Sequence, residues 1–478
     1  MITTNSVRYL LIHVAIALML LLAVSSCNKD SRSDNDQVPK PVNPLEGRVL
    51  PHLDHSAYFK DSIDSPQKVT RKCLECHPKS AGEVMKTAHW TWESGDVERN
   101  GKTMLLGKKN QVNNFCISIV GNWASCTTCH AGYGWSDANF DFTKEENVDC
   151  LVCHDGSGTY VKTKSGMPNK NVNLKVVAGS VRRPARENCG ICHFSGGGGM
   201  GVKHGDLDES LINANQELDF HMGKLNFQCV DCHTTHEHKI SGKVNTTYTE
   251  KTAALRFNCE NCHTEAPHKE PRLNKHTSRI ACQTCHIPEF ARKLPTKMIW
   301  DWSKAGDSTR IDSPHEYLKI KGEFQYEEGV IPTYAWFNGK MERYVLGDKL
   351  DAETEHYMNK PIGSRSDQKS KIWPFKVHHA TQPYDVVNNI IIPPLTSGEG
   401  GYWTKFNWSY ALEIGAKLSN LPYSGKFGFA KTKMYWPITH MVTTSKNALT
   451  CTDCHSPGGR FNWVELGYKH DPLQGPEK

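Results

Sequence analysis

The sequence predicts a mainly α-helical fold with extensive loops and little β structure. Long amphipathic or alternating patterns are rare in the 478 residues, and short helical stretches such as 206–221 are separated by Gly-rich and polar segments. A further observation indicates what these short elements surround. The chain contains 18 Cys and 24 His, and the pattern Cys-x-x-Cys-His occurs eight times.

The composition excludes several classes of protein. Hydrophobic residues make up 38% of a chain long enough for two or three domains, so neither a disordered protein nor a multi-span membrane protein is expected. The 57 basic and 51 acidic residues are scattered along the chain and give a net charge of +6. Because positive and negative charges are distributed so evenly, the sequence predicts no nucleic-acid partner.

The repeated pattern is typical of covalent attachment of c-type haem. Two cysteines three positions apart lie on one side of a helical turn, where their sulfurs can bond the two vinyl groups of haem. The histidine that follows presents an imidazole to the iron. Zinc ribbons and redox disulfides also use Cys-x-x-Cys, but a histidine after every one of eight pairs favours haem.

We therefore expect a multihaem cytochrome c fold organised around eight stacked covalent haems. The haems are expected to be held by Cys73 and Cys76, Cys126 and Cys129, Cys150 and Cys153, Cys189 and Cys192, Cys229 and Cys232, Cys259 and Cys262, Cys282 and Cys285, and Cys451 and Cys454. The expected proximal iron ligands are His77, His130, His154, His193, His233, His263, His286 and His455.

Eight haems change the expected disulfide content and charge of the protein. The motifs use 16 of the 18 cysteines and leave only Cys27 and Cys116, too few for a disulfide framework. A ferric haem with two ionised propionates carries about −1, so eight of them bring the net charge to about −2. Many Lys and Arg side chains are then expected to pair with propionates. Calcium is compatible with the sequence, but no motif supports it.

Residues 1–27 are interpreted as a lipoprotein-type signal peptide. An apolar run from Tyr9 to Val24 precedes small residues and Cys27, and it is short for a membrane span of about 20 residues. An ordinary cleaved signal peptide or a short membrane anchor are the alternatives. We expect a periplasmic protein, anchored to a bacterial membrane through a lipid on Cys27, with residues 28–47 as a polar tether.

Three regions follow the tether. Residues 48–291 form a haem-rich region that carries haems 1–7. Residues 292–446 contain no haem motif but much Trp, Tyr, Pro and Gly, and we interpret them as a loop-rich lobe, with helices and at most a small sheet, that covers the haems. Residues 447–478 carry haem 8 and the C-terminal tail.

Electron-transfer haems normally have six iron ligands, so eight proximal histidines require eight further ligands. Sixteen histidines lie outside the motifs, and all of them except His13 belong to the mature chain. Any one of them could instead be a surface histidine. The most ligand-like settings belong to His89, His204, His221, His236, His268, His276, His378 and His440. The sequence does not separate His236 from His238, or His378 from His379.

The Gly-rich stretch 195–208 is the most unusual in the chain. It matches G-x-G-x-x-G, but it follows a haem motif instead of a strand, which excludes a dinucleotide site. Glycines would let the backbone pass close to a porphyrin, and the adjacent Lys203 and His204 could reach different irons. A lysine ligates iron only when neutral, so its pKa would have to fall from about 10.4. An exposed loop lysine is the alternative.

These residues resemble the octahaem tetrathionate reductase family of exported multihaem cytochromes. The resemblance also covers the long gap before the last motif and the segments 114–117, 126–135, 148–155, 202–208 and 281–288. The core of that family is similar to those of pentahaem nitrite reductase and octahaem hydroxylamine oxidoreductase. This chain departs from the nitrite reductases because it has no Cys-x-x-Cys-Lys, so its lysine must come from elsewhere.

The resemblance implies electron-transfer haems with two histidine ligands and one active-site haem at the second motif. Lys203 would be the distal ligand of that haem and His130 its proximal ligand. Cys116 would be a thiol near this haem, with a small buried apolar residue as the alternative.

The implied activity is respiratory reduction of small oxidised sulfur or nitrogen compounds such as tetrathionate, nitrite and hydroxylamine. The expected partners are a small anionic or polar substrate and a quinol dehydrogenase or cytochrome that donates electrons. An electron conduit without its own substrate and a hydroxylamine-oxidising enzyme are the alternatives.

Overall fold

The computed structural model describes residues 53–99, 102–242 and 257–475. The expected signal peptide 1–27, the tether 28–47 and Cys27 lie outside the described residues. No helix in the described part of the chain combines the length and the apolar character needed to cross a membrane.

The haem motifs begin on or beside helical turns. Each motif overlaps such an element, namely α2 (Pro66–Leu74), α5 (Trp123–Cys126) with η2 (Thr127–Cys129), α6 (Leu151–His154), α8 (Arg186–His193), α9 (Cys229–Cys232), η8 (Cys259–Asn261), α11 (Cys282–His286) and α14 (Cys451–Cys454). The other α-helices are α3 (Ser80–Val84), α4 (Ala88–Thr91), α7 (Leu174–Gly179), α10 (Pro271–His276), α12 (Tyr402–Lys405) and α13 (Trp408–Leu418).

The expectation of little β structure is wrong. The structure is 26% helical and 20% strand, and its described residues contain an eight-stranded sheet in the order β10-β14-β12-β5-β7-β6, with β8 and β13 also paired to β12. The sheet strands are β5 (Thr296–Asp301), β6 (Tyr317–Leu318), β7 (Gly322–Glu327), β8 (Thr333–Phe337), β10 (His356–Tyr357), β12 (Lys371–Asp385), β13 (Ile390–Ile391) and β14 (Phe427–Pro437). All of them lie in the lobe that we expected to be loop-rich.

In the described part of the chain, three pairs of strands lie outside this sheet. They are β1 (Glu93–Arg99) with β2 (Lys102–Gly107), β3 (Thr235–His236) with β4 (Lys239–Ile240), and β9 (Lys340–Arg343) with β11 (Asn359–Ile362), all antiparallel.

The longest strand, β12, shows why the sequence conceals the sheet. Most of its residues are buried on both faces, so the alternation of polar and apolar residues that marks a half-exposed strand is missing. Pro374 and Pro383 lie within it, and proline inside a run argues against a central strand. Strand β14 nevertheless pairs with β12 in antiparallel register from Phe375 opposite Pro437 to Asp385 opposite Phe427.

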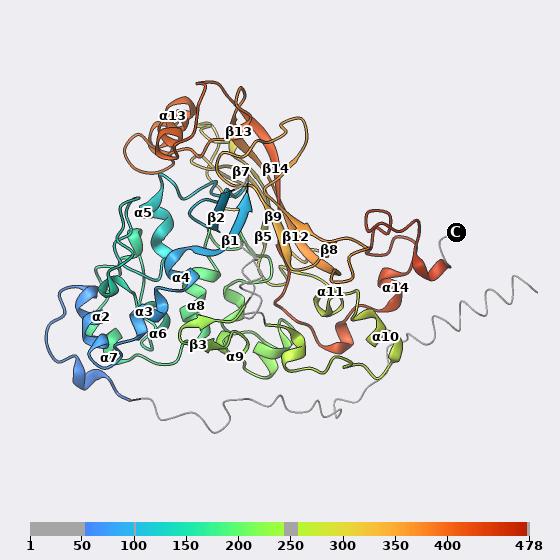
Figure 1. The fold of residues 1–478 in the computed structure, drawn as a ribbon, viewed down its shortest axis with the longest axis horizontal. Coiled ribbons are helices and arrows are strands. Elements are labelled where there is room, and N and C mark those ends of the chain that lie inside the picture. Colours follow the sequence, from blue (N-terminus) through green and yellow to red (C-terminus); the bar gives the residue numbers. More distant parts are fainter. Residues whose placement is uncertain (1–52, 100–101, 243–256, 476–478) are drawn as a thin grey trace, which may run out of the picture.

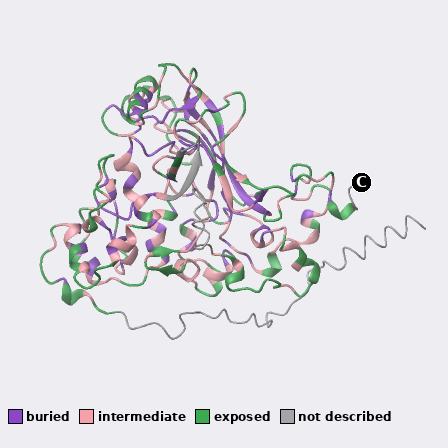
Figure 2. Cartoon of the chain, viewed as in Figure 1, coloured by how far each residue is buried: buried purple, intermediate pink, exposed green. Residues whose placement is uncertain are grey.

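The sheet covers the helical region and packs against it. Figure 1 shows the sheet standing beside and above the short helices that carry the motifs, with α14 at the far side. Figure 2 shows that burial is densest along the long strands of the sheet. The main core joins Trp300, Trp302 and Trp436 of the sheet region to Phe115 and Val202 of the haem-rich region. The sheet therefore supports the two segments that contain Cys116 and Lys203.

Candidate haem array and active site

A continuous cavity of about 2600 Å³ lies between the motif helices and the sheet. A site for one small molecule has about 300–1000 Å³, so this cavity has room for several porphyrins. Motifs two to seven all contribute cysteines to its wall, namely Cys126, Cys129, Cys153, Cys189, Cys192, Cys229, Cys232, Cys259, Cys262, Cys282 and Cys285.

The motifs lie next to one another in a connected series. Thiols within hydrogen-bonding reach join motifs one and three, two and four, four and five, and six and seven, through Cys73 and Cys150, Cys129 and Cys192, Cys189 and Cys229, and Cys259 and Cys282. Electrostatic contacts extend the series through Cys153 and Cys189, Cys232 and Cys262, and Cys285 and Cys454. Motif two is thus a side branch at motif four.

Five pairs of imidazoles face each other across the motifs. A metal–imidazole bond is about 2 Å long and the ring centre lies about 1.1 Å farther, so two imidazoles on opposite sides of one metal have centres about 6.2 Å apart. The observed separations are 6.2 Å for His89 and His193, 6.1 Å for His221 and His263, 6.3 Å for His233 and His440, 6.2 Å for His268 and His286, and 6.3 Å for His276 and His455. These residues fit haem iron with two histidine ligands at motifs four to eight.

The remaining candidate histidines differ in their surroundings. His204 and His238 both line the cavity, and burial lowers the pKa of His204 to about 3. His236 is exposed on β3. Among the described residues that line the cavity, neither His378 nor His379 appears.

The two histidines of β12 have partners outside the cavity. His378 is fully buried, with Nδ1 3.0 Å from Asn114 Oδ1, and His379 Nδ1 lies 2.5 Å from Glu355 Oε1. These contacts leave His204 and His238 as the candidate histidines that line the cavity outside the five ring pairs.

The Gly-rich loop passes between the second motif and Cys116. A Cβ atom at Gly196 would lie 2.2 Å from the carbonyl oxygen of Cys192, which only a residue without a side chain avoids. Gly198 has a φ of +108°, and a Cβ atom there would lie 3.3 Å from the Cys116 sulfur. The loop therefore uses its glycines to fit closely against other protein segments, and it carries Lys203 into the cavity wall.

Lys203 has the electrostatic properties of a neutral amine ligand. Burial, with a smaller contribution from Lys108, lowers its pKa from 10.5 to about 7, and Cys129 opposes this shift. The Nζ atom lies 5.2 Å from the centre of the Trp436 ring. Burial therefore makes the neutral amine of Lys203 far more accessible than it is for a lysine in water.

Cys116 is fixed by the turn in which it lies. The side-chain oxygen of Asn113 accepts the N–H groups of Phe115, Cys116 and Ile117 at 3.0, 2.8 and 3.1 Å. Burial raises the pKa of the Cys116 thiol, and Lys321 partly offsets this effect. The group is therefore a thiol at neutral pH, and it lines the same cavity as Lys203.

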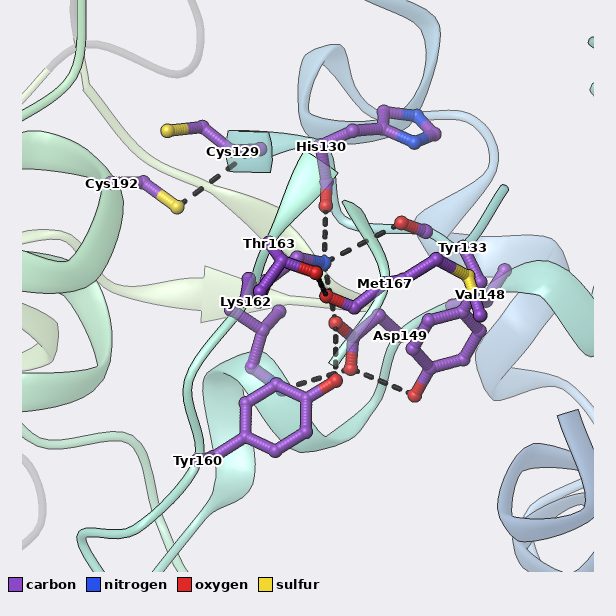
Figure 3. A network of polar contacts seen from close by, with 12 residues as sticks. Cys129, His130, Tyr133, Val148, Asp149, Tyr160, Lys162, Thr163, Met167 and Cys192 are labelled. Carbon is purple, nitrogen blue, oxygen red and sulfur yellow. Dashed lines mark hydrogen bonds and ion pairs between the residues drawn. The ribbon is translucent and has the colours of Figure 1, made fainter. Parts of the chain in front are cut away.

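The structure does not bring the His130 ring to Lys203. His130 is fully buried, its Nε2 lies 2.8 Å from the backbone oxygen of Trp90, and burial lowers its pKa to about 3. Its ring lies among aromatic side chains, with centroids 4.8 Å from Trp135. Figure 3 shows the ring pointing away from the Cys129 side chain. Within the described residues Nδ1 has no hydrogen-bond partner, and His130 is not among the residues that line the cavity. Ligation of an iron in the cavity would therefore require the His130 ring to turn.

A buried ion pair that the sequence analysis missed holds the backbone of the second motif (Figure 3). The Nζ atom of Lys162 lies 2.5 Å from Asp149 Oδ2 and donates to the backbone oxygen of His130 at 2.7 Å. The hydroxyls of Tyr133 and Tyr160 each donate to Asp149 at 2.9 Å. Asp149 directly precedes Cys150 within the 148–155 segment. An acidic residue at this position was the one feature of the sequence that could have indicated the ion pair.

Positive side chains lie near Cys116 and Lys203. The sequence alone did not show which lysines and arginines these would be. Lys321 donates to the backbone oxygen of Gly198 at 3.4 Å, and Lys108 lines the cavity. Burial lowers the pKa of Arg343 to about 9, so this guanidinium keeps its charge at neutral pH. These charges favour a small anion in this part of the cavity.

Comparisons with known proteins agree with this arrangement. A family model described as bacterial cytochrome c matches residues 297–458. The crystal structure of an octaheme cytochrome c from Shewanella oneidensis is similar with a TM-score of 0.83 and 45% identity, covering 89% of this chain and 98% of that chain. An uncharacterised protein of Archaeoglobus fulgidus is 25% identical over 299 residues, which are 52% of this chain and 96% of that protein.

These similarities support covalently bound c-type haem, with its iron, as the cofactor. They also confirm the part of the resemblance that concerns the octahaem cytochromes. The identity of 45% extends over most of this chain and nearly the whole solved chain. This chain belongs to the octahaem cytochrome c family.

Proposed function

We propose that this protein is an exported octahaem reductase of small oxidised sulfur or nitrogen compounds, with tetrathionate as the first substrate to test and nitrite and hydroxylamine next. The observation that carries the proposal is Lys203. An amine with a pKa near 7 lies in the cavity wall beside the second motif. At motifs four to eight, by contrast, a second histidine faces the histidine of the motif.

The proposed site consists of Lys203, Cys116 and the residues that hold them. Cys126 and Cys129 would attach the haem, and His130 and Lys203 would ligate its iron. When bound, c-type haem supplies one-electron carriers and an iron at which substrate can be reduced.

The protein residues then have separate roles in the reaction. Lys203 occupies the substrate side in its neutral form and can hold a proton when it swings away, because its pKa is near 7. Lys108, Lys321 and Arg343 attract the anion. The Cys116 thiol faces the same space, where it can contact a sulfur-containing substrate. Two electrons and one broken S–S bond convert tetrathionate into two thiosulfate ions.

The connected series of motifs supports electron delivery to this site. Closely spaced haems at motifs four to eight would each have two histidine ligands, and the contact of Cys192 with Cys129 joins them to motif two. Many carriers beside one site suit reactions that need two or more electrons without release of radicals. A quinol dehydrogenase or another cytochrome is the proposed electron donor.

The test is anaerobic oxidation of reduced viologen by the purified holoprotein, offered tetrathionate, nitrite and hydroxylamine in turn. We expect turnover with at least one of them, and a fall of about tenfold or more in Lys203→Leu, because the amine holds both a ligand position and a proton. Lys405→Leu, which changes an exposed lysine of α12, is the matched control and should turn over normally. Full reduction of the haems without turnover on any substrate would favour the electron conduit.

We also propose that a lipid on Cys27 anchors the protein to a bacterial membrane on its periplasmic side. Because acyl chains would provide the attachment, Cys27→Ser should move the holoprotein from the membrane fraction to the soluble fraction without loss of haem. Fractionation with haem staining measures this, and a variant that stays in the membrane fraction would contradict the lipid anchor.

A further inference from the structure

The C-terminal tail folds back onto the proximal histidine of the eighth motif. Asp471 Oδ1 lies 2.6 Å from Nδ1 of His455, and the Trp463 ring stacks on the imidazole with centroids 5.1 Å apart and planes 24° apart. Asp471 is buried, with 7% of its surface exposed. With Nδ1 engaged by the carboxylate, Nε2 is the nitrogen left for iron, and the centre of the His276 ring lies 6.3 Å from that of His455.

We propose that Asp471 is a positioning and tuning residue that lowers the reduction potential of the haem at the eighth motif. A histidine whose Nδ1–H group donates to a carboxylate is a more basic ligand, and it stabilises the more positive oxidation state of its metal. The buried negative charge also favours ferric over ferrous iron. The proposal needs haem at this motif but does not depend on reductase activity.

One other histidine of the array also has a close carboxylate at Nδ1: that atom of His238 lies 2.8 Å from Glu83 Oε2. The Glu83 side chain is 24% exposed, whereas that of Asp471 is 7% exposed, so the charge of Glu83 is better screened by water.

His154 and His233 contact neutral backbone oxygens, of Arg182 at 2.9 Å and of Ser241 at 2.8 Å. A carboxylate also approaches His440, but Asp206 Oδ2 is 3.3 Å away.

The charge of Asp206 is also shared with other donors. Its Oδ2 atom accepts the backbone N–H groups of Thr439 at 2.6 Å and His440 at 2.9 Å. The strongest transfer of negative charge to an iron ligand is therefore expected at His455. A haem of low potential passes electrons downhill to its neighbours, so this end of the array suits the arrival of electrons from a donor.

The surroundings of Asp471 allow its charge to be removed without changing its shape. Besides contacting His455, Oδ1 accepts the backbone N–H of Leu473 at 2.9 Å, at the start of the short helix η11 (Pro472–Gln474). Asparagine offers an oxygen in the same place and can accept both hydrogen bonds. Asp471→Asn therefore tests the charge, and Asp471→Glu keeps the charge.

The experiment is a potentiometric titration of the full-length holoprotein, followed by the α-band absorbance of ferrous haem. In Asp471→Asn we expect one eighth of the absorbance to titrate at a higher potential. The ferrous-to-ferric ratio of that haem should rise about tenfold at a fixed potential, which corresponds to about 59 mV for one electron. The control Glu465→Gln removes an exposed carboxylate of the same tail and should leave the titration unchanged.

Three results would overturn the proposal. The first is a titration of Asp471→Asn that superimposes on the wild type, with all haems still attached. The second is an equal shift in Asp471→Glu, since that variant keeps the charge. The third is loss of one haem from Asp471→Asn, which would assign Asp471 a structural role. The titration contains no substrate, so its outcome is independent of the viologen assay that tests the reductase.

Discussion

Single residues in this protein are held in protonation states that differ from those in water. Lys297 is 2% exposed, its Nζ lies 3.1 Å from the centre of the Phe324 ring, and burial lowers its pKa to about 6. The folded protein therefore holds this lysine neutral at pH 7, whereas the unfolded chain binds a proton there. Stability is lost as pH falls from about 10.5 toward 6, because the unfolded state binds more protons in that window.

Replacing this lysine should stabilise the protein. We expect Lys297→Met to raise the free energy of unfolding at pH 7 by about 1–4 kcal/mol, since an apolar side chain has no desolvation cost. The gain should shrink at pH 10, because this pH is close to the ordinary lysine pKa of 10.5 and deprotonating the unfolded chain then costs little. Guanidinium denaturation at both pH values measures this, with the exposed Lys405→Met as control. A destabilised variant would show that the contact of Lys297 with Phe324 outweighs its burial.

Replacing Lys162 should have the opposite effect on stability, because this buried lysine is paired with a buried carboxylate, Asp149. Lys162→Met should lower the free energy of unfolding by about 3–5 kcal/mol, since it leaves a buried carboxylate without its cation. It should also loosen the second motif, whose His130 oxygen loses a donor. Denaturation of the variant checks the stability. The double variant Asp149→Asn/Lys162→Met should recover part of the loss, and no recovery would mean that the two side chains act independently.

At the scale of elements, the Gly-rich loop is the segment on which the proposed site depends most. Gly198→Ala should destabilise the protein by about 1–3 kcal/mol and reduce turnover, because φ is +108° and the new Cβ would press on Val202, Trp300 and Cys116. Denaturation and the viologen assay measure the two effects. Gly82→Ala, in helix α3 with its nearest atom 3.6 Å away, is the control and should be neutral or slightly stabilising. Normal turnover in Gly198→Ala would contradict the role of the loop.

The elements also show where prediction from sequence succeeds and where it ends. The motif turns were predictable because attachment to haem fixes a local spacing of Cys, Cys and His. The sheet was not, since β12 is buried on both faces and contains two prolines. His378 was a candidate iron ligand because the sequence did not predict the strand that contains it. The structure places His378 in β12, where it is buried and contacts Asn114.

At the scale of the whole molecule, the cavity and the ring pairs depend on contacts between distant segments. His440 faces His233, and His276 faces His455, across separations in sequence that spacing alone cannot connect. For the same reason the Lys162–Asp149 network and the positive side chains near Cys116 could not be placed from the sequence. The octahaem family itself was predictable, because its motifs are local and numerous.

The central claim is that one haem, at the second motif, has a lysine ligand while the haems at the other motifs have two histidines. Near-infrared magnetic circular dichroism of the oxidised holoprotein tests it most directly, since its charge-transfer bands distinguish these ligand pairs. The account predicts one His/Lys haem among bis-His haems, and loss of that band alone in Lys203→Leu with every haem still attached. A spectrum of bis-His haems only, unchanged in Lys203→Leu, would contradict it.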